Sequence, residues 1–388
     1  MDFSQWGEPS NEWLAFASAN AAFLASQSDV SLPPLEQQEI ANRMRATFAK
    51  TLVTSTGLDK LVATQDHVVP TRDGNSITVR SYRPVLLGSQ SLPGHVYYHG
   101  GGFIFGSPET ELFNCSWVAH ALNIAAVHVC YRHTPHVKGL TPWHDALDGF
   151  EWIAAHTDML GIDPTRIVVG GMSAGASLTA CVVQNELRRS RESNTPSRIK
   201  GQLLGIPNLV HNKAFPYHLF ADREKVSLVQ CAEAAVIPKA RMDMFTNLLG
   251  SEVDPFDHTW SPGLADEEEL RGMPQTAFLI AGWDPLRDDA LWYAQKLRNA
   301  GVRTKVHIFP GLPHSFSSFR QLPSHRRWNE VQADSLRWGL ADEDGWIVEA
   351  PPVMPPAMEG AATITSSAEP VIAGSSASEL MTKAANSL

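Results

Sequence analysis

The chain has 388 residues, and its 31 basic and 41 acidic side chains give a formal net charge of −10 at pH 7. An acidic chain lacks the basic field that attracts phosphates, so we expect no nucleic-acid partner. The length allows one large domain with appendages, and 43% hydrophobic with 19% charged residues is the composition of an ordinary globular enzyme.

The termini and the cysteines predict the location of the protein. The N-terminal MDFSQWGEPS has neither the basic nor the apolar region of a secretory signal, and no stretch reaches the roughly 18 apolar residues of a membrane span. The four cysteines are scattered and form no CxxC pair. The C-terminal Asn386-Ser387-Leu388 lacks the basic middle residue of the peroxisomal signal. These features predict a reduced, cytoplasmic protein without a membrane span.

Residues 1–64 are predicted to form an N-terminal helical cap segment. A helix is expected to begin near Leu35, directly after two prolines, because Leu35, Ile40, Met44 and Phe48 recur at helical spacing. The next stretch, residues 65–84, changes to a strand pattern with Asp73-Gly74 between two β-rich runs, which indicates a hairpin.

From about residue 94 the sequence alternates between strand and helix patterns. Strands are predicted over 95–100, 125–131, 166–171, 201–207, 276–282 and 304–311, and helices over 142–156, 177–189 and 287–301. Such alternation with apolar strands predicts an α/β fold whose mostly parallel sheet is covered on both faces.

Two segments interrupt or follow this α/β pattern. Residues from about 207 to 265 have many aromatic residues and no strand pattern, which indicates an inserted helical lid. Residues 342–388 are rich in Ala, Ser, Pro and Glu, which is typical of a disordered tail. We therefore predict a catalytic domain over residues 65–341 that contains the lid.

The stretch VVGGMSAGASL, residues 168–178, matches two kinds of functional loop in part. A phosphate-binding loop would need a lysine where this chain has Ala176, and a dinucleotide loop would need a glycine at Met172. The pattern G-x-S-x-G is complete, since Gly171 and Gly175 flank Ser173 between a predicted strand and helix. Ser173 is therefore the candidate nucleophile.

Three further motifs support a serine hydrolase. His99-Gly100-Gly101-Gly102 follows a predicted strand and offers backbone N–H groups for an oxyanion hole. Asp284 and His314 each follow a later strand, in the order of acid and base that this chemistry requires. Two competing acids, Asp288 and Asp289, fall where a helix begins and are expected to complement its dipole instead.

Other candidate features receive structural interpretations. His133, His136 and His144 lack an acid or cysteine partner, so we expect no metal and no cofactor. Four tryptophans, Trp143, Trp152, Trp260 and Trp283, are expected to pack in the core or a pocket, and Trp283, beside Asp284, is a candidate wall of the acyl pocket.

Residues 65–340 resemble the hormone-sensitive-lipase-like branch of the α/β-hydrolases. The resemblance is carried by HGGGF, DPTRIVVGGMSAG, the run from SPGLADEEEL to LRNAG, and FPGLPHSF. It implies an α/β-hydrolase fold, with Ser173, Asp284 and His314 as triad and the N–H groups of Gly101, Gly102 and Ala174 as oxyanion donors. It also implies a lid built from the N-terminal segment and residues 207–265.

The chain departs from the family pattern in two places. Met172 occupies a position where many members carry aspartate, and the stretch from Tyr131 to His136 replaces the common YRLAPE. Some similar chains resemble fungal enzymes that modify natural products as esterases or lactonases.

Together these motifs predict a serine carboxylesterase that acts on a small ester or lactone through an acyl-enzyme. The alternative is an acyltransferase or another non-hydrolytic member of the same fold.

Overall fold

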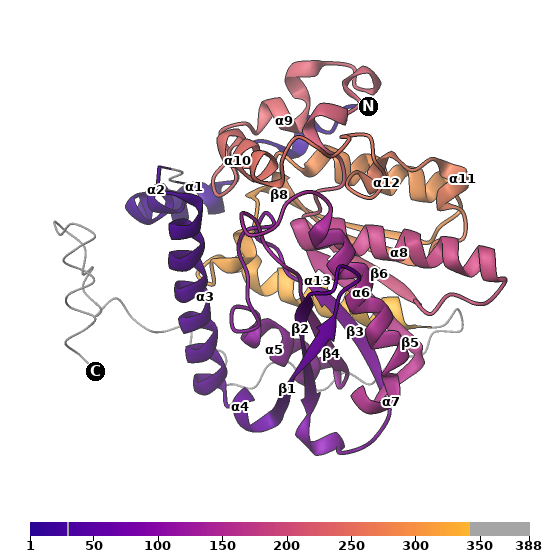
Figure 1. The fold of residues 1–388 in the computed structure, drawn as a ribbon. Helices are drawn as coiled ribbons and strands as arrows, with labels where there is room; N and C mark the ends of the chain where they lie inside the picture. The colour runs from indigo at the N-terminus through magenta and orange to yellow at the C-terminus, as the bar shows by residue number, and fades with distance from the viewer. Residues whose placement is uncertain (29–30, 342–388) are drawn as a thin grey trace. The chain divides into compact units, whose positions relative to one another are not determined.

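The computed structural model describes residues 1–28 and 31–341, so the predicted tail lies outside the described residues. Eight strands form one sheet in the order β1-β2-β4-β3-β5-β6-β7-β8 (Figure 1). The strands are β1 Val62–Pro70, β2 Ser76–Pro84, β3 Leu92–Tyr98, β4 Ala125–Cys130, β5 Ile162–Met172, β6 Gly201–Gly205, β7 Gln275–Trp283 and β8 Thr304–Pro313.

The sheet is parallel except at one edge, as the sequence predicts. β1 and β2 form the predicted antiparallel hairpin across Asp73-Gly74, and β2 also pairs antiparallel with β4. All other neighbours pair parallel. The central strands are apolar throughout because both faces are covered, so no face needs to alternate with polar residues.

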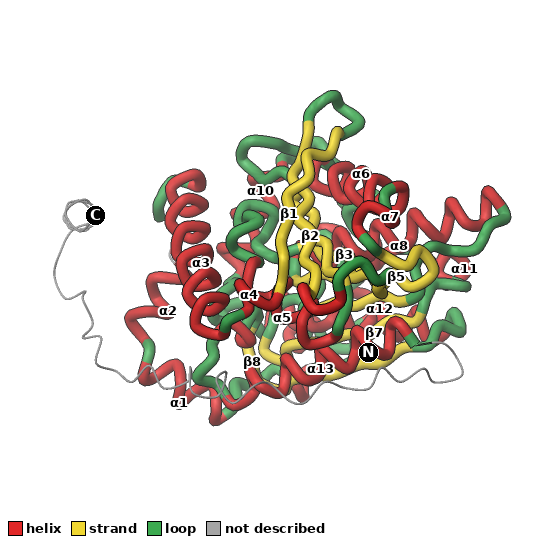
Figure 2. Tube along the Cα trace, turned by 90° about the horizontal axis from the view of Figure 1, so that it is seen from below, coloured by secondary structure: helices red, strands yellow, loops and turns green. Residues whose placement is uncertain are grey.

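Helices cover the sheet on two sides. The helices are α1 Asn11–Ala19, α2 Ala21–Ser28, α3 Pro34–Thr56, α4 Leu58–Leu61, α5 Leu112–Leu122, α6 Thr141–Ala155, α7 Thr157–Leu160, α8 Ala174–Ser193, α9 Ser227–Gln230, α10 Lys239–Leu249, α11 Glu267–Leu270, α12 Arg287–Asn299 and α13 Pro323–Leu340. Helices α6 and α8 pack together on one side of the strands, and α5 packs with α13 and α3 on the other (Figure 2). The predicted α/β-hydrolase architecture is thus confirmed.

The α3 helix exists as predicted, and three of the four apolar residues that indicated it lie on its exposed side. Leu35, Met44 and Phe48 are 50%, 51% and 52% exposed. The buried side of the helix instead carries Gln37 near its beginning and Leu52 near its end. Helical spacing of apolar residues does not identify the buried face of a helix when polar side chains form that face, as Gln38 and Asn42 do here.

Residues 207–265 contain short helical turns, α9 and α10 but no strand, as expected. The N-terminal residues lie against this segment (Figure 1). The N-terminal amine donates a hydrogen bond to the carbonyl of Leu219 at 2.8 Å, and the Gln230 amide donates one to the carbonyl of Ser4 at 3.1 Å. Two segments that are far apart in the sequence therefore pack together.

Candidate active site

Ser173 lies on a sharp turn between β5 and α8. Its backbone angles, φ 54° and ψ −119°, are strained for a residue with a side chain. The turn needs small neighbours, since a Cβ at Gly171 would collide with the carbonyl of Gly175, and a Cβ at Gly175 would collide with the carbonyl of Tyr98. Met172 fills space, because its sulfur packs against the Cα of Gly205 on β6.

The structure brings Ser173, His314 and Asp284 into one hydrogen-bonded line. Their positions follow β5, β8 and β7, whose carboxyl ends meet at the same edge of the parallel sheet. The His314 Nε2 is 2.8 Å from the Ser173 Oγ, and the His314 Nδ1 is 2.7 Å from an Asp284 carboxylate oxygen. The other carboxylate oxygen accepts a hydrogen bond from the Leu286 N–H at 2.9 Å. His314 and Asp284 are almost fully buried.

The two competing acids have other partners. Asp288 pairs with the Arg287 guanidinium at 2.7 Å and accepts the N–H of Ser227 at 2.8 Å. Asp289 accepts the N–H groups of Leu209 at 2.8 Å and Val210 at 3.2 Å. Both occupy the first turn of α12, as predicted, and both also fasten segments of residues 207–265 to the domain. Burial raises the pKa of both carboxyl groups.

Two of the three predicted oxyanion donors lie at the cavity that Ser173 lines. A Cβ on Gly100 would come within 3.2 Å of the Ser173 Cβ, so the glycine loop passes directly over the elbow. Gly102 and Ala174 line a cavity together with Ser173, whereas Gly101 does not. Among residues 1–28 and 31–341, the N–H groups of Gly101, Gly102 and Ala174 have no protein acceptor. These donors are therefore available to a ligand.

His99, the first residue of the glycine motif, is the centre of a buried chain of imidazoles. Its Nδ1 is 2.7 Å from the Nε2 of His128, and its Nε2 is 2.8 Å from the Nε2 of His133. Tyr131 stacks on the ring of His99 and donates its hydroxyl to the His99 carbonyl at 2.8 Å. Burial lowers the pKa of His128 and of His133 to about 3 and that of His99 well below its usual value. All three rings are therefore neutral at pH 7 and help to fix the base of the loop.

A small cavity of about 30 Å³ opens at Ser173. Its walls also include Asn208 and Asn212 after β6, Trp260, Leu286, and Ile237, Met242, Phe245, Thr246 and Leu249 from the region around α10. Trp283, the tryptophan that the sequence suggested for this wall, instead packs near Trp13, with ring centroids 6.3 Å apart. The abundance of aromatic residues in 207–265 was the sequence signal for these walls, and it did not identify Phe245.

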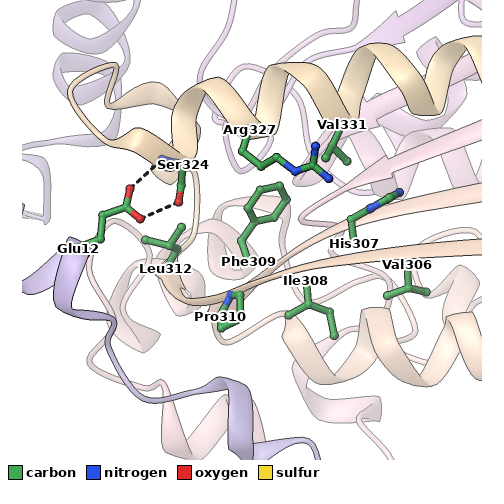
Figure 3. Close-up of a pocket in the computed structure, with 10 residues that line it drawn as sticks. All are labelled: Glu12, Val306, His307, Ile308, Phe309, Pro310, Leu312, Ser324, Arg327 and Val331. Carbon is green, nitrogen blue, oxygen red and sulfur yellow. Dashed lines mark hydrogen bonds between the residues drawn. The ribbon is translucent and has the colours of Figure 1, made fainter.

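A larger cleft of about 510 Å³ lies between α1, β8 and α13 (Figure 3). Figure 3 shows Glu12 of α1 reaching the start of α13, where its carboxylate accepts the N–H and hydroxyl of Ser324 at 2.8 and 2.7 Å. None of the residues that line this cleft is Ser173, Asp284 or His314. The Glu12 contact complements the positive end of the α13 dipole and joins α1 to the domain.

Two further findings concern the described part of the chain. None of its helices combines the length and the apolar character that crossing a membrane requires. The four cysteines all have free thiols.

Comparison with known proteins agrees with this geometry. Residues 95–318 match a family model described as an alpha/beta hydrolase fold. Versiconal hemiacetal acetate esterase of Dothistroma septosporum is 30% identical over 274 residues, which cover 70% of this chain and 81% of that protein. Ethyl acetate hydrolase of Pseudomonas putida is 32% identical, over 65% of this chain and 74% of that protein.

Among solved structures, vibralactone cyclase superposes with a TM-score of 0.77 at 26% identity, covering 87% of this chain and 96% of that one. The residues matched by the family model include the glycine loop and the serine elbow. The chain therefore belongs to the hormone-sensitive-lipase-like family of α/β-hydrolases and is a carboxylic ester hydrolase.

Proposed function

We propose that Ser173, His314 and Asp284 cleave carboxylic esters through an acyl-enzyme. His314 accepts the Ser173 proton as the Oγ attacks the ester carbonyl, and it then donates that proton to the leaving alcohol. Asp284 holds the imidazole in the tautomer that leaves Nε2 free to accept. Water attacks the acyl-enzyme in the second step, with His314 again as base. The observation that carries this proposal is the line of contacts of 2.8 and 2.7 Å at a strained elbow.

The oxyanion is assigned to the N–H groups of Gly101, Gly102 and Ala174. Support comes from the lack of protein acceptors for these groups among the described residues. Loss of one such donor typically costs about 2.7–4 kcal/mol of transition-state stabilisation. Gly102 and Ala174 are the stronger assignments, since both line the cavity at Ser173.

The division of the chain is part of the proposal. We assign residues 1–64 to an N-terminal cap segment, residues 65–341 to the catalytic domain, and residues of about 207–265 to a lid within it. The contacts of the N-terminal amine and of Ser4 with the lid support a cap built from both segments. Four free thiols support a reducing compartment, and a cytoplasmic location is proposed on that ground.

The acyl group of the substrate is proposed to be short. The leaving alcohol must lie next to His314, and His314 does not line the 30 Å³ cavity, so the cavity is the place for the acyl group. A cavity of this size admits only a small group, such as the methyl of an acetyl ester. Two relatives are named for acetate esters, which agrees with this size. A lactone from secondary metabolism remains in the proposed substrate class, because the structural neighbour is named for one.

Hydrolysis of p-nitrophenyl esters of increasing acyl length tests both proposals. We expect acetate to give the highest kcat/KM and octanoate the lowest, and Ser173→Ala to abolish turnover of every ester. Full turnover by Ser173→Ala would contradict the acyl-enzyme. A preference for octanoate with an inactive Ser173→Ala would contradict only the short acyl pocket.

An acyl-transfer or ring-closing activity is the second candidate function. The observation that favours it is the similarity to vibralactone cyclase, whose name describes a ring-forming enzyme. Analysis of products with an added alcohol acceptor separates the two candidates. A hydrolase yields the free acid, whereas a transferase yields the new ester.

A further inference from the structure

Helix α3 turns a row of polar side chains toward the body of the protein, and two of them contact the glycine loop, residues 99–106. Gln38, Asn42 and Arg45 are spaced four and three residues apart, so they lie on one face of the helix. The exposed residues Met44 and Phe48 lie away from this face. The inward side of the N-terminal half of α3 is therefore made of hydrogen-bonding groups, although helices usually pack through apolar ones.

The side chain of Asn42 forms two hydrogen bonds with the backbone of Gly106, one as acceptor and one as donor. Its Oδ1 accepts the N–H of Gly106 at 2.8 Å, and its Nδ2 donates to the carbonyl of Gly106 at 3.2 Å. Gly106 has φ 137°, and a Cβ there would collide with the imidazole of His99. Gly106 is thus held between the imidazole chain and the side chain of Asn42.

Gln38 holds the same loop one helical turn earlier. Its Nε2 donates to the carbonyl of Ile104 at 2.6 Å and to the carbonyl of Thr134 at 3.2 Å. Thr134 in turn donates its N–H to the carbonyl of Phe103 at 2.9 Å. Gln38 therefore joins the loop to the segment after β4.

The residues held by α3 set the direction of an oxyanion donor. The N–H groups of Ile104 and Phe105 both point to the carbonyl of Gly101, at 3.1 and 2.9 Å. In a planar trans peptide the C=O and N–H point in opposite directions. The peptide that joins Gly101 to Gly102 thus turns its carbonyl toward Ile104 and Phe105 and its N–H, that of Gly102, away from them. Gly102 lines the cavity at Ser173.

We propose that Gln38 and Asn42 are positioning residues for the oxyanion hole, acting through Ile104 and Gly106 on the direction of the Gly102 N–H. This inference rests on the proposed function, because it takes the Gly102 N–H as an oxyanion donor. Neither side chain touches the substrate. Their effect falls on the transition state, where the oxyanion has formed, more than on the bound ester.

A purely structural role, in which these side chains only attach α3, is the competing explanation. Arg45 provides the matched control for it. Arg45 lies on the same helix face and forms an ion pair with Glu111 at 2.8 Å. The Glu111 carboxylate also accepts a hydrogen bond from the Tyr97 hydroxyl at 3.1 Å. Arg45 thus attaches α3 to the body, and within the described part of the chain no hydrogen bond joins it to residues 99–106, although its charge helps to lower the pKa of His99.

The test compares Gln38→Met, Asn42→Leu and Arg45→Gln in the full chain. The measurements are kcat and KM on p-nitrophenyl acetate, the inhibition constant of a methyl trifluoromethyl ketone, and the midpoint of urea unfolding. We expect Gln38→Met and Asn42→Leu each to lower kcat about tenfold, a fraction of the 10²–10³-fold lost with a whole donor. KM should change little, and the inhibition constant should rise in parallel with the loss of kcat/KM, because the ketone adduct carries the oxyanion. Arg45→Gln should lower the unfolding midpoint but leave kcat.

Asn42→Asp is a milder replacement that keeps the test valid if Asn42→Leu fails to fold. The carboxylate can still accept the Gly106 N–H but cannot donate to its carbonyl, so kcat should fall between wild type and Asn42→Leu. The inference is overturned if Gln38→Met and Asn42→Leu change stability as Arg45→Gln does and leave kcat and ketone affinity unchanged. An active Ser173→Ala in the same assay would overturn the proposed function and this inference together. An inactive Ser173→Ala beside unchanged Asn42 variants overturns only this inference.

Discussion

The two loops on either side of Ser173 are held in place by different kinds of interaction. The acid loop, residues 282–289, is held by charged side chains of its own helix, and Arg287, Asp288 and Asp289 are all buried. The glycine loop, residues 99–106, is held by the neutral amides of Gln38 and Asn42, which come from a distant helix and are only half-buried.

The difference predicts which property a mutation will change. Removing one member of a buried ion pair leaves an uncompensated charge and is strongly destabilising. Removing one partner of a neutral hydrogen bond costs less, about 1–3 kcal/mol when the group left behind is buried. Changes around the acid loop should therefore appear in folding, whereas changes around the glycine loop should appear in catalysis.

The largest effect is expected at Asp284, the one acid-loop residue whose loss should act on catalysis. Asp284→Asn should lower kcat about 10⁴-fold, because the amide favours the wrong tautomer of His314. Asp288→Asn is the matched control, and it should lower the free energy of unfolding but keep most of the activity per folded molecule. Equal losses of activity in both variants would contradict the assignment of Asp284 as the acid. Steady-state kinetics and urea unfolding of both variants provide the measurement.

The next prediction compares the two loops by replacing one of the polar side chains that hold each loop with methionine. Arg287→Met should lower the free energy of unfolding by about 3–5 kcal/mol, since Asp288 stays buried without its partner. Gln38→Met should lower it by less, about 1–3 kcal/mol, because the buried carbonyls of Ile104 and Thr134 lose only a neutral donor. Urea unfolding followed by tryptophan fluorescence measures both. The comparison fails if the two variants are equally destabilised.

A smaller effect is expected where the lid meets the glycine loop. The ring of Phe245 on α10 packs so closely on Gly102 that a Cβ there would collide with it. Phe245→Ala should enlarge the cavity and raise the ratio of kcat/KM for hexanoate over acetate by about tenfold, since one methylene in an apolar pocket is worth about 1–3 kcal/mol. Phe256→Ala is the control, because Phe256 is 60% exposed and does not line the cavity. An unchanged ratio in Phe245→Ala would mean that another wall limits the acyl group.

The smallest effect concerns the pH dependence of stability. Burial raises the pKa of Asp289 well above its usual 3.8, more than the Leu209 N–H lowers it, and the charge of Asp284 raises it further. The folded state then binds the proton more tightly than the unfolded state, so stability falls as pH rises from about 4 toward the folded pKa. The free energy of unfolding of the wild type minus that of Asp289→Asn should therefore be smaller at pH 8 than at pH 5. A difference in unfolding free energy that is the same at both pH values would contradict this.

The motifs of the glycine loop and the serine elbow could be found from the sequence because their chemistry is local. Gly171 and Gly175 are needed where the backbone is crowded, and the strand and helix around Ser173 follow from the apolar pattern. Asp284 and His314 could be chosen because each directly follows a strand, and the ends of parallel strands meet at one edge.

The sequence pattern was a poor guide to surfaces between segments. The spacing of Leu35, Ile40, Met44 and Phe48 predicted a helix without indicating its buried face, and Leu35, Met44 and Phe48 are exposed. The sequence pattern suggested Trp283 as a wall of the acyl pocket, whereas Trp260 lines the cavity. Helices α5 and α13, which cover one side of the sheet, were not predicted at all. In each case the partner of the segment lies far away in the sequence.

The sequence by itself thus determined the α/β class, the order of the strands that carry the site, and the identities of the three proposed catalytic residues, because periodicity and turn chemistry act over a few residues. Only the tertiary structure decided the distances that join Asp284, His314 and Ser173, how small the cavity at Ser173 is, and that Gln38 and Asn42 reach the glycine loop. These features depend on contacts across 30 to more than 100 residues of sequence, where the pattern of one segment carries no information about the other.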